Sequence, residues 1–427
     1  MLDTKLIRIN ELSTSDHKMV FKQLMHHFDV ESLLRCYQQL DGKAAVGSDG
    51  ITKEKYGENL IENIHNLVGR LKQMAYKPNA VRQVMIPKEG KRGATRPLGI
   101  GNFEDKLVQK RMQDILEAIF DPLFLSSSFG FRTGLGCHDA VKALRDHLYH
   151  RPVYKVIDLD LSNYFGTINH DKLMAMIERK IQDKRFIRYL KRMLKAGLLE
   201  DGKIIRSDTG VPQGNIASPV LANIYAHFVL DEWFEKVVKS CCRGEVKLIR
   251  YADDAVICCT LGKDATRIKE AMGKRLKRFD LSMNEEKTHV VTFSKAQRLA
   301  SSTFDFLGFT FYVGITKGGK SIPKVKSSGK KIKAKLVVVN EWCRKYKNKY
   351  RLAELWKIFC TKLEGHIQYY GVSFNSKMVN VFLRKAQNIF WKWMNRRSQR
   401  NSMTMKKFND YRKLYPPPYA RVCQRLF

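Results

Sequence analysis

The sequence predicts an α+β protein organised into two or three substructures. Runs of apolar and β-branched residues bounded by turn residues indicate strands and hairpins, and longer segments with a helical apolar period indicate amphipathic helices. The chain has 427 residues, which is more than a single hydrophobic core usually organises. Hydrophobic residues make up 44% and aromatic residues 11% of it, so enough apolar surface is available for folded cores.

The chain carries 78 Lys and Arg residues against 42 Asp and Glu residues, a net charge of +36. A compact protein tolerates such an excess best beside a polyanion, so nucleic acid is the expected partner. A basic protein of a membrane surface is the alternative, but no apolar run reaches the roughly 18 residues of a transmembrane helix, and no signal peptide follows Met1. We therefore expect a soluble cytoplasmic protein without a membrane partner.

The nine cysteines are scattered along the chain, and no Cys-x-x-Cys pair occurs. This spacing argues against a structural zinc site. In a chain without a secretion signal, we expect reduced thiols that pack as small hydrophobic side chains.

A cationic hairpin is expected after a helical lead-in of about 45 residues. Residues 84–100 have strand character on both sides of a flexible loop, and Lys88 and Arg96 flank that loop. A point charge and a planar guanidinium on its two sides could hold a triphosphate. A solvated basic hairpin without a ligand is the alternative interpretation.

Two helices are expected next, one over Glu104–Phe120 that Asp121-Pro122 ends, and one starting near His138. The glycine-punctuated loop Ser128–Gly134 separates them. Its Arg132 either contacts phosphate or caps the surface.

The segment 153–165 is typical of a strand that ends in a run holding two acids. With a period of two, Asp158 and Asp160 share one face of this strand. Like charges about 4 Å apart repel by roughly 4 kcal/mol at an effective dielectric near 20, so these carboxylates need solvent, a partner or a cation.

A second pair of acids lies in Leu248–Ile257, where apolar strand residues flank Ala252-Asp253-Asp254. We expect a hairpin with both carboxylates at the edge of a sheet, although Asp is also common in turns that have no function. Neighbouring antiparallel strands could bring Asp160, Asp253 and Asp254 together around divalent metal. Two Mg²⁺ ions about 4 Å apart could activate a 3′-hydroxyl and stabilise leaving pyrophosphate, which describes nucleotidyl transfer.

The remaining segments predict scaffold elements. The polar, kinked loop 210–219 opens onto an apolar helix over 220–233, so its backbone could approach a docked molecule. Residues 262–280 predict a basic amphipathic helix, 289–293 a strand, and 304–311 an aromatic hairpin with a glycine at its bend.

The charge is concentrated at the C-terminal end. Residues 311–427 contain 28 Lys and Arg but only four Asp and Glu, which leaves +24 of the total +36 in this part. Basic residues interleaved with aromatic residues suit phosphate contacts combined with base stacking. Helices with solvated basic faces and an aromatic core are the alternative.

Taken in order, these motifs resemble the reverse transcriptases encoded by bacterial and organellar group II introns, often called maturases. The resemblance covers nearly the whole chain and rests on the order and spacing of eight segments: Gly47–Ile51, Ile86–Ile100, Ser128–Gly134, Asp160–Phe165, Val211–Pro219, Tyr251–Asp254, Glu286–Thr288 and Phe306–Phe309. It implies a right-hand polymerase, with fingers and palm in residues 1–312 after an N-terminal helical extension. A basic helical thumb and maturase domain would follow in residues 313–427.

The resemblance also implies roles for individual residues. The catalytic set is Asp160, Asp253, Asp254 and Lys287, with Lys287 as the weaker assignment, a proton donor to pyrophosphate. The metal ligands are Asp160, Leu161, Asp253 and Asp254. The nucleotide-binding set is Lys88, Arg96, Leu161, Phe165, Gln213 and Gly214, in which Phe165 checks the sugar 2′ position. The RNA-binding set is Arg132, Lys331, Lys333, Lys335, Tyr369, Tyr370, Arg396 and Arg397. Asp158 falls off the catalytic position.

The implied function is an RNA-directed DNA polymerase that also binds a structured intron RNA and helps it splice. Its cofactor would be two Mg²⁺ ions, with Mn²⁺ as a substitute, and its partners dNTPs, an RNA template with a DNA primer, and target DNA. A dimer and an association with the bacterial nucleoid fit this picture. The alternatives are a protein that mainly folds RNA, and a domesticated relative in DNA repair or phage defence.

Three departures from the family pattern stand out. Gly166 occupies a position where the family usually has Asp, and His366 replaces a Trp often found in the maturase motif. No Cys/His-rich nuclease module follows the basic region, so we expect no cleavage of a second DNA strand.

Overall fold

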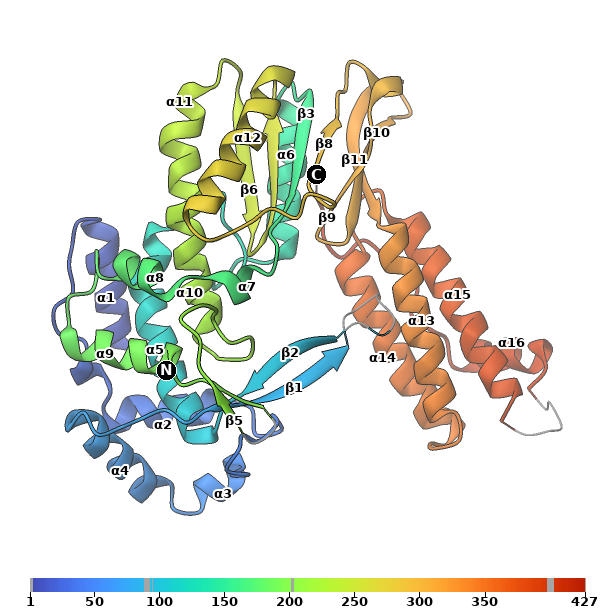
Figure 1. Ribbon diagram of the computed structural model, residues 1–427. Coiled ribbons are helices and arrows are strands. Elements are labelled where there is room, and N and C mark those ends of the chain that lie inside the picture. Colours follow the sequence, from blue (N-terminus) through green and yellow to red (C-terminus); the bar gives the residue numbers. More distant parts are fainter. Residues whose placement is uncertain (1–2, 88–92, 94, 201–202, 398–402, 427) are drawn as a thin grey trace. The chain divides into compact units, whose positions relative to one another are not determined.

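The computed structural model describes residues 3–87, 93, 95–200, 203–397 and 403–426. The chain divides into two compact units (Figure 1). Of the described residues, unit 1 holds those up to Ala140 together with Leu159–His289, and unit 2 holds Val141–Asp158 and those from Val290 onward. None of the helices in the described chain is both long and apolar enough to cross a membrane. The expected change of domain at residue 312 stays a prediction.

A helical layer around a long buried helix forms the first part of unit 1. Helix α5 (Phe103–Phe120) matches the predicted span, and its apolar face is fully buried at Leu107, Ile115 and Leu116. A short 3₁₀ turn at Asp121–Leu123 ends it, where Pro122 cannot continue the backbone ladder. The helices around it are α1 (Thr4–Ser15), α2 (Val30–Gln39), α3 (Lys53–Gly57) and α4 (Leu60–Lys72).

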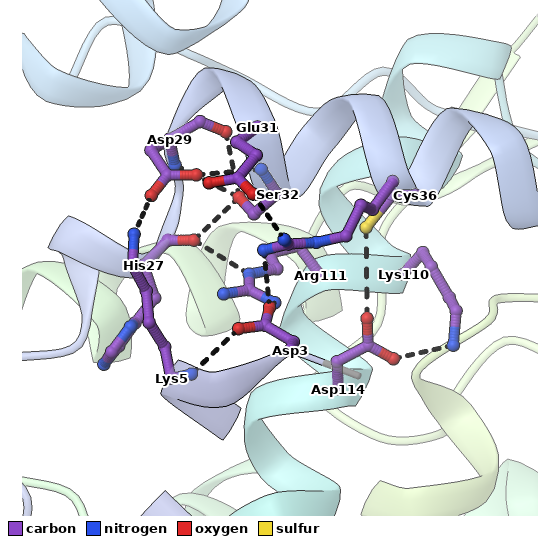
Figure 2. Close-up of polar contacts among 11 residues, drawn as sticks. Asp3, Lys5, His27, Asp29, Glu31, Ser32, Cys36, Lys110, Arg111 and Asp114 are labelled. Carbon is purple, nitrogen blue, oxygen red and sulfur yellow. Dashed lines mark hydrogen bonds and ion pairs between the residues drawn. The ribbon is translucent and has the colours of Figure 1, made fainter. Parts of the chain in front are cut away.

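A buried ion pair anchors the N-terminal helix to this layer. Arg111 of α5 is 1% exposed and donates to Asp3 Oδ2 at 2.7 Å and to the His27 carbonyl at 2.8 Å (Figure 2). Arg35 of α2 donates to the same carboxylate oxygen at 3.0 Å. Asp3 also caps α1, so one carboxylate ties α1, α2 and α5 together.

The predicted cationic hairpin is present as β1 (Val81–Pro87) and β2 (Thr95–Ile100), paired antiparallel with Arg96 opposite Ile86. It belongs to a four-stranded sheet of order β2-β1-β4-β5, in which β4 is Leu198–Glu200 and β5 is Lys203–Ile205. Lys88, which was expected on the rim of this hairpin, lies outside the described residues. Arg96 is exposed at the base of the loop.

A second four-stranded sheet carries the carboxylates. Its order is β6-β7-β3-β8, built from β3 (Lys155–Asp160), β6 (Val246–Tyr251), β7 (Asp254–Cys259) and β8 (His289–Thr292). The predicted alternation in β3 is confirmed, because Ile157, Leu159 and Leu161 are buried whereas Asp158 and Asp160 are half-buried. The basic amphipathic helix α12 (Gly262–Arg278) packs against β7, close to its predicted span.

Short helices and the 210–219 loop connect these strands. They are α7 (Tyr164–Thr167), α8 (His170–Ile177), α9 (Lys184–Leu194), α10 (Ser218–Ala226) and α11 (Lys239–Cys241). Two π-helical segments, His227–Asp231 and Phe234–Val238, continue α10. The apolar helix therefore begins two residues before the predicted Val220, with Pro219 in its first turn, where a missing N–H is tolerated.

Unit 2 combines an aromatic hairpin with a helical bundle. The predicted hairpin is β9 (Phe304–Phe306) and β10 (Phe309–Ile315), and β11 (Ser321–Ser327) extends it to three strands. Leu307 and Gly308 turn it with φ angles of 48° and 80°, which suits a tight two-residue hairpin loop. The helices are α6 (Cys137–His150, mostly in this unit), α13 (Gly329–Tyr346), α14 (Leu352–Tyr370), α15 (Ser376–Asn395) and α16 (Met405–Leu414).

The bundle has an aromatic core. Trp356 of α14 is 4% exposed and packs edge-on against Phe390 of α15 and Phe408 of α16, with ring centroids 5.1 and 5.8 Å away. For Trp356 the structure therefore supports the alternative of an aromatic core over stacking on bases. The cations of unit 2 are left largely on the bundle surface, as at Lys330, Lys331 and Lys333.

Candidate active site

The tip of the β6–β7 hairpin presents two adjacent carboxylates. Tyr251 pairs with Asp254 across the last step of the ladder, so Ala252 and Asp253 form the two-residue turn. Ala252 has a φ of 57°, a left-handed conformation that favours tight hairpin turns but costs roughly 1–2 kcal/mol for a residue with a Cβ. The prediction of a hairpin with Asp253 and Asp254 at its tip is confirmed.

Asp160 ends β3, which neighbours β7 in the sheet, and its charge acts on Asp253, the residue before β7. A tight turn holds its backbone: the amide of Asn284 donates to the Asp160 carbonyl at 2.9 Å, and the amide of Asp160 donates to Thr288 Oγ1 at 3.3 Å. The same turn carries Lys287. Its ammonium donates to both carboxylate oxygens of Asp160, at 2.9 and 2.8 Å.

The charges of these groups act on one another. Burial raises the pKa of the Asp253 carboxyl above its ordinary value, and the negative charge of Asp160 raises this pKa further. Lys287 and Arg250 pull in the opposite direction, because each stabilises the ionised form. Asp160 and Asp253 therefore belong to one electrostatic group, with Lys287 as its exposed cation.

Across the described chain, no group of three or more His, Cys, Asp or Glu side chains is arranged to hold a metal ion as it stands. The gathering of Asp160, Asp253 and Asp254 around divalent metal stays a prediction, and Asp160 is paired with the ammonium of Lys287. The roles of these aspartates as metal ligands stay predictions. The same holds for Leu161, which follows Asp160 in the chain and has a buried side chain.

Two of the predicted nucleotide-binding residues, Phe165 and Gln213, accept backbone hydrogen bonds from neighbouring segments. The amide of Val211 donates to the Phe165 carbonyl at 2.7 Å, which ties the 211–214 loop to α7. The amide of Gly99 in β2 donates to the Gln213 carbonyl at 2.6 Å, which ties the same loop to the cationic hairpin. Gly214 has a φ of 106°, and a Cβ there would lie 2.2 Å from the Gly99 carbonyl oxygen, so only glycine fits.

A cavity of about 250 Å³ lies beside this junction and is lined by residues that include Gly99, Gly166 and Gln213. Phe165 packs edge-on against Phe131, with ring centroids 6.2 Å apart. A Cβ on Gly166 would lie 2.4 Å from the side-chain amide nitrogen of Asn163, so this position has no room for a side chain as Asn163 lies. The nucleotide-binding roles themselves remain predictions.

The guanidinium of Arg132 forms hydrogen bonds and an ion pair with other residues of the chain. It donates to both carboxylate oxygens of Asp121, at 2.7 and 3.4 Å, and to the carbonyls of Asp121, Leu125 and Ser128. Of the two interpretations of Arg132, the geometry favours the cap over the phosphate contact. Its role in RNA binding stays untested.

The other predicted RNA-binding residues lie in unit 2. Lys331 and Lys333 are exposed on α13, and Lys335 lies 4.7 Å from the ring centroid of Tyr370. Tyr370 is 3% exposed and belongs to the core, and the Tyr369 hydroxyl donates to the Leu307 carbonyl at 2.9 Å. Near the end of α15, Arg397 donates to the Tyr350 carbonyl and Arg396 lies over the Trp393 ring.

Sequence reasoning gave no role to Arg250 and Asp231. Arg250 is 1% exposed, and it forms a two-pronged ion pair with the equally buried Asp231, at 2.8 and 2.6 Å. One signal could have identified Arg250: it is a charged residue inside a predicted strand, directly after the apolar Leu248 and Ile249. Asp231 had no such signal, because its pairing depends on the tertiary structure.

Comparison with known proteins decides the family. Residues 86–311, more than half of the chain, match the family model described as reverse transcriptase (RNA-dependent DNA polymerase). The chain belongs to the reverse transcriptase family. The matched segment contains all three predicted catalytic aspartates and Lys287.

Several relatives are proteins of group II introns or of other introns. The chain is 27% identical over 463 aligned positions to the group II intron-encoded protein LtrA of Lactococcus lactis subsp. cremoris, covering 88% of this chain and 75% of LtrA. It is 35% identical over 207 positions to an uncharacterized 91 kDa protein in the cob intron of Schizosaccharomyces pombe. It is 29% identical over 308 positions to a putative COX1/OXI3 intron 1 protein of Saccharomyces cerevisiae.

The two yeast proteins are much longer than their match. The cob intron protein aligns over 48% of this chain but over only 25% of its own length, and the second yeast protein over 61% and 36%. The predicted resemblance to group II intron reverse transcriptases and maturases is confirmed by these relatives together with the family match.

Proposed function

We propose that this reverse transcriptase copies RNA into DNA from a DNA primer, and that it binds group II intron RNA and assists its splicing. The observation that carries the proposal is that Asp160 at the end of β3 and Asp253 in the turn before the neighbouring strand β7 interact electrostatically, inside the segment matched to the reverse transcriptase family. The substrates would be dNTPs, an RNA template and a DNA primer.

The residues at this edge of the sheet suit divalent magnesium. Carboxylate oxygens are the ligands that Mg²⁺ prefers, and the bidentate contact of Lys287 with Asp160 marks this carboxylate as a place where positive charge is stabilised. We infer that Asp160, Asp253 and Asp254, with the backbone of Leu161, would hold the ions, and that Mn²⁺ could replace Mg²⁺. The chemistry expected from a bound pair is activation of the primer 3′-hydroxyl and stabilisation of leaving pyrophosphate.

The other residues would position the substrates around that centre. Phe165, whose backbone carbonyl accepts from the amide of Val211, would check the sugar 2′ position. Gln213 and Gly214 would face the incoming base and the template, and Arg96 with Lys88 would hold the triphosphate by charge. Lys287, with its amine near Asp160, would be available to protonate pyrophosphate.

Primer extension tests the catalytic assignment. We expect the double variant Asp253→Ala, Asp254→Ala to lose DNA synthesis on an RNA template by at least a thousandfold, the usual order for removal of charge stabilisation at a reacting centre. RNA binding, measured by filter retention, should change by less than about twofold, since two carboxylates contribute little to a surface that attracts phosphate.

The matched control is Asp410→Ala, which removes a carboxylate from the surface of α16, where Asp410 pairs with Lys413 at 3.4 Å. It should extend primers at the normal rate. Normal extension by the Asp253, Asp254 double variant would disprove the catalytic assignment.

The proposed role in splicing rests on the family and on the extent of the likeness to LtrA, a protein named for the group II intron that encodes it. A splicing assay with a group II intron RNA at low Mg²⁺ tests it. The protein should raise the fraction of spliced RNA, and the double aspartate variant should do so as well as the natural chain. A protein that leaves splicing unchanged would remove this half of the proposal.

A further inference from the structure

Arg250 lies directly beneath the turn that carries Asp253, and all five of its N–H donors are used. Nε and Nη2 donate to the two carboxylate oxygens of Asp231, at 2.8 and 2.6 Å. Nη1 donates to Asn223 Oδ1 at 3.1 Å and to the Ala252 carbonyl at 2.9 Å. Nη2 also donates to Ser128 Oγ at 2.6 Å. A guanidinium has five donors in a fixed plane, so this set fixes its position completely.

The contact with Ala252 acts on the catalytic turn itself. Ala252 precedes Asp253, and its left-handed φ of 57° is an uncommon conformation that the surroundings must stabilise. The hydrogen bond from Arg250 fixes the Ala252 carbonyl, which belongs to the peptide unit that leads into Asp253. The direction in which Asp253 leaves the turn therefore depends on Arg250.

A second chain of contacts reaches the same turn through Asn223 and Gly130. Asn223 of α10 accepts from Arg250 and donates from Nδ2 to the Gly130 carbonyl at 2.6 Å. A Cβ on Gly130 would lie 2.3 Å from the backbone nitrogen of Ala252, so the loop is in close contact with the turn. The backbone of Arg250 also bonds this loop, through Ser127 and Phe129 at 2.8 and 2.9 Å.

Stability alone does not explain a buried pair of this kind. The side chains of Arg250 and Asp231 are 1% and 0% exposed, and moving two charges out of water costs several kcal/mol per ion, which their attraction only roughly offsets. An apolar pair of the same volume would stabilise the fold about as well. What the ion pair adds is geometry, since planar donors and a carboxylate allow one mutual orientation.

Asp231 reaches Arg250 from an unusual helix. It is the last residue of the π-helical segment His227–Asp231, which continues α10, the helix that also carries Asn223. Such wide turns often mark functional sites, because they change which side chains a helix presents on one face. Here the continuous helix presents both Asn223 and Asp231 to the same guanidinium.

We propose that Arg250 is a positioning residue: clamped by Asp231 and Asn223, it fixes the Ala252–Asp253 turn so that the Asp253 carboxylate can bind divalent metal. The proposal rests on the proposed function, since it assigns a task within the same centre. Groups that orient metal-binding carboxylates typically change metal affinity by roughly tenfold to a hundredfold when they are altered.

The test is Arg250→Lys, which keeps the charge but has one ammonium that cannot reach all five acceptors. The Mg²⁺ concentration that gives half-maximal primer extension should rise roughly tenfold or more. Mn²⁺ should restore activity better than Mg²⁺, because Mg²⁺ demands near-ideal octahedral geometry. Terbium luminescence of the full-length protein without nucleic acid should show ion binding weakened to a similar extent.

The matched control is Arg111→Lys in the full chain. Arg111 is as deeply buried as Arg250 and is also paired with a carboxylate, Asp3, but it belongs to the anchor of α1 (Figure 2). Arg111→Lys should lower the midpoint of thermal unfolding and leave terbium binding and the Mg²⁺ dependence of primer extension unchanged. If Arg250→Lys behaves in the same way, the positioning role is wrong.

A milder variant covers the case in which Arg250→Lys does not fold. Asn223→Ala leaves the Arg250–Asp231 pair intact and removes the link to Gly130, so it should raise the Mg²⁺ requirement by a smaller factor of the same sign. An unchanged Mg²⁺ requirement in Asn223→Ala would then overturn the proposal. If the natural chain binds terbium but never extends primers, the proposed function fails, whereas the terbium comparison still tests Arg250.

Discussion

Individual residues at the sheet edge differ in the charges that face them. The carboxylate of Asp160 pairs with the exposed ammonium of Lys287, whereas the buried guanidinium of Arg250 donates to the carbonyl of Ala252, which precedes Asp253. The first cation can leave the carboxylate when a metal or a triphosphate arrives, since its side chain is 53% exposed and flexible. The guanidinium of Arg250 cannot move in this way, because five hydrogen bonds hold it.

His366 is a buried residue whose ring nitrogens lack hydrogen-bond partners among the described residues, which lowers the stability of the fold. It is 4% exposed, it stacks on Phe382 with ring centroids 3.6 Å apart, and neither ring nitrogen has a hydrogen-bond partner among the described residues. Burial, with a smaller effect of Lys335, lowers the pKa of His366 to about 3. As pH falls below about 6.5, His366 is therefore protonated in the unfolded chain but stays neutral in the folded chain. The free energy of unfolding consequently decreases as pH falls from about 6.5 towards 3.

We expect His366→Phe to raise the free energy of unfolding by about 1–3 kcal/mol at pH 7, because it removes unpaired buried nitrogens and keeps the stacked ring. The gain should grow as pH falls from 7 to 5, measured by urea denaturation at each pH. His65→Phe, on the exposed face of α4, is the control and should show no such growth. Stability curves for His366→Phe and the natural chain that stay parallel with pH would contradict the assignment.

At the scale of elements, the β6–β7 hairpin depends on a loop far away in sequence. Residues 127–130 run beside Arg250, and Gly130 leaves no room for a side chain against Ala252. The loop was predicted as a glycine-punctuated segment with a candidate phosphate contact at Arg132. In the structure the loop supports the turn, and Arg132 holds the loop through Asp121, as the alternative of a cap predicts.

Gly130→Ala should destabilise the protein by about 1–3 kcal/mol, the usual cost of overpacking. It should also reduce primer extension at least tenfold, because relief of the clash moves Ala252 and with it Asp253. The measurements are thermal unfolding and extension rate at saturating Mg²⁺. Gly69→Ala is the control: this helical position is open, so alanine should raise stability by about 0.5–1 kcal/mol and leave extension unchanged. Equal extension rates for both variants would refute the support role.

At the scale of the whole chain, most of the net positive charge lies in a different part of the sequence from the candidate active-site carboxylates. The carboxylates lie in unit 1, and residues 311–427 of unit 2 carry +24 of the total +36. In the described part of that unit, much of this charge lies on the exposed faces of helices such as α13, and the aromatic rings largely fill the core between them. Phosphate attraction, more than base stacking, is therefore the contribution we expect from this unit.

The salt dependence of RNA binding measures how much phosphate attraction unit 2 contributes. Each phosphate neutralised adds about 0.7–0.9 to the slope of log K against log salt, so Lys331→Gln with Lys333→Gln should reduce the slope for RNA binding by roughly 1.5. Lys239→Gln is the control, because Lys239 belongs to α11 in unit 1 and lies outside the basic segment 311–427. A double variant with the full slope would move the RNA surface away from α13.

Local patterns were enough to predict many of the elements. The alternation in Lys155–Asp160, the apolar face of Phe103–Phe120 and the Asp-containing turn at Ala252–Asp253 follow from residues close together in sequence, so their spans could be predicted to within a few residues. The three aspartates, Lys287 and the family itself also came from motifs in the chain. Strand β11 was missed, because its residues Ser321–Ser327 have no strong alternation and form a strand by pairing with β10.

The sequence by itself determined the family, the polyanion-binding charge and the carboxylates on which the proposed chemistry depends. Only the tertiary structure decided what holds those carboxylates. Arg250 and Asp231 meet across a strand and a π-helical turn, Lys287 reaches Asp160 from a turn after α12, and Arg132 contacts Asp121. These pairings depend on which segments fold against each other, and a local period in sequence carries no information about that.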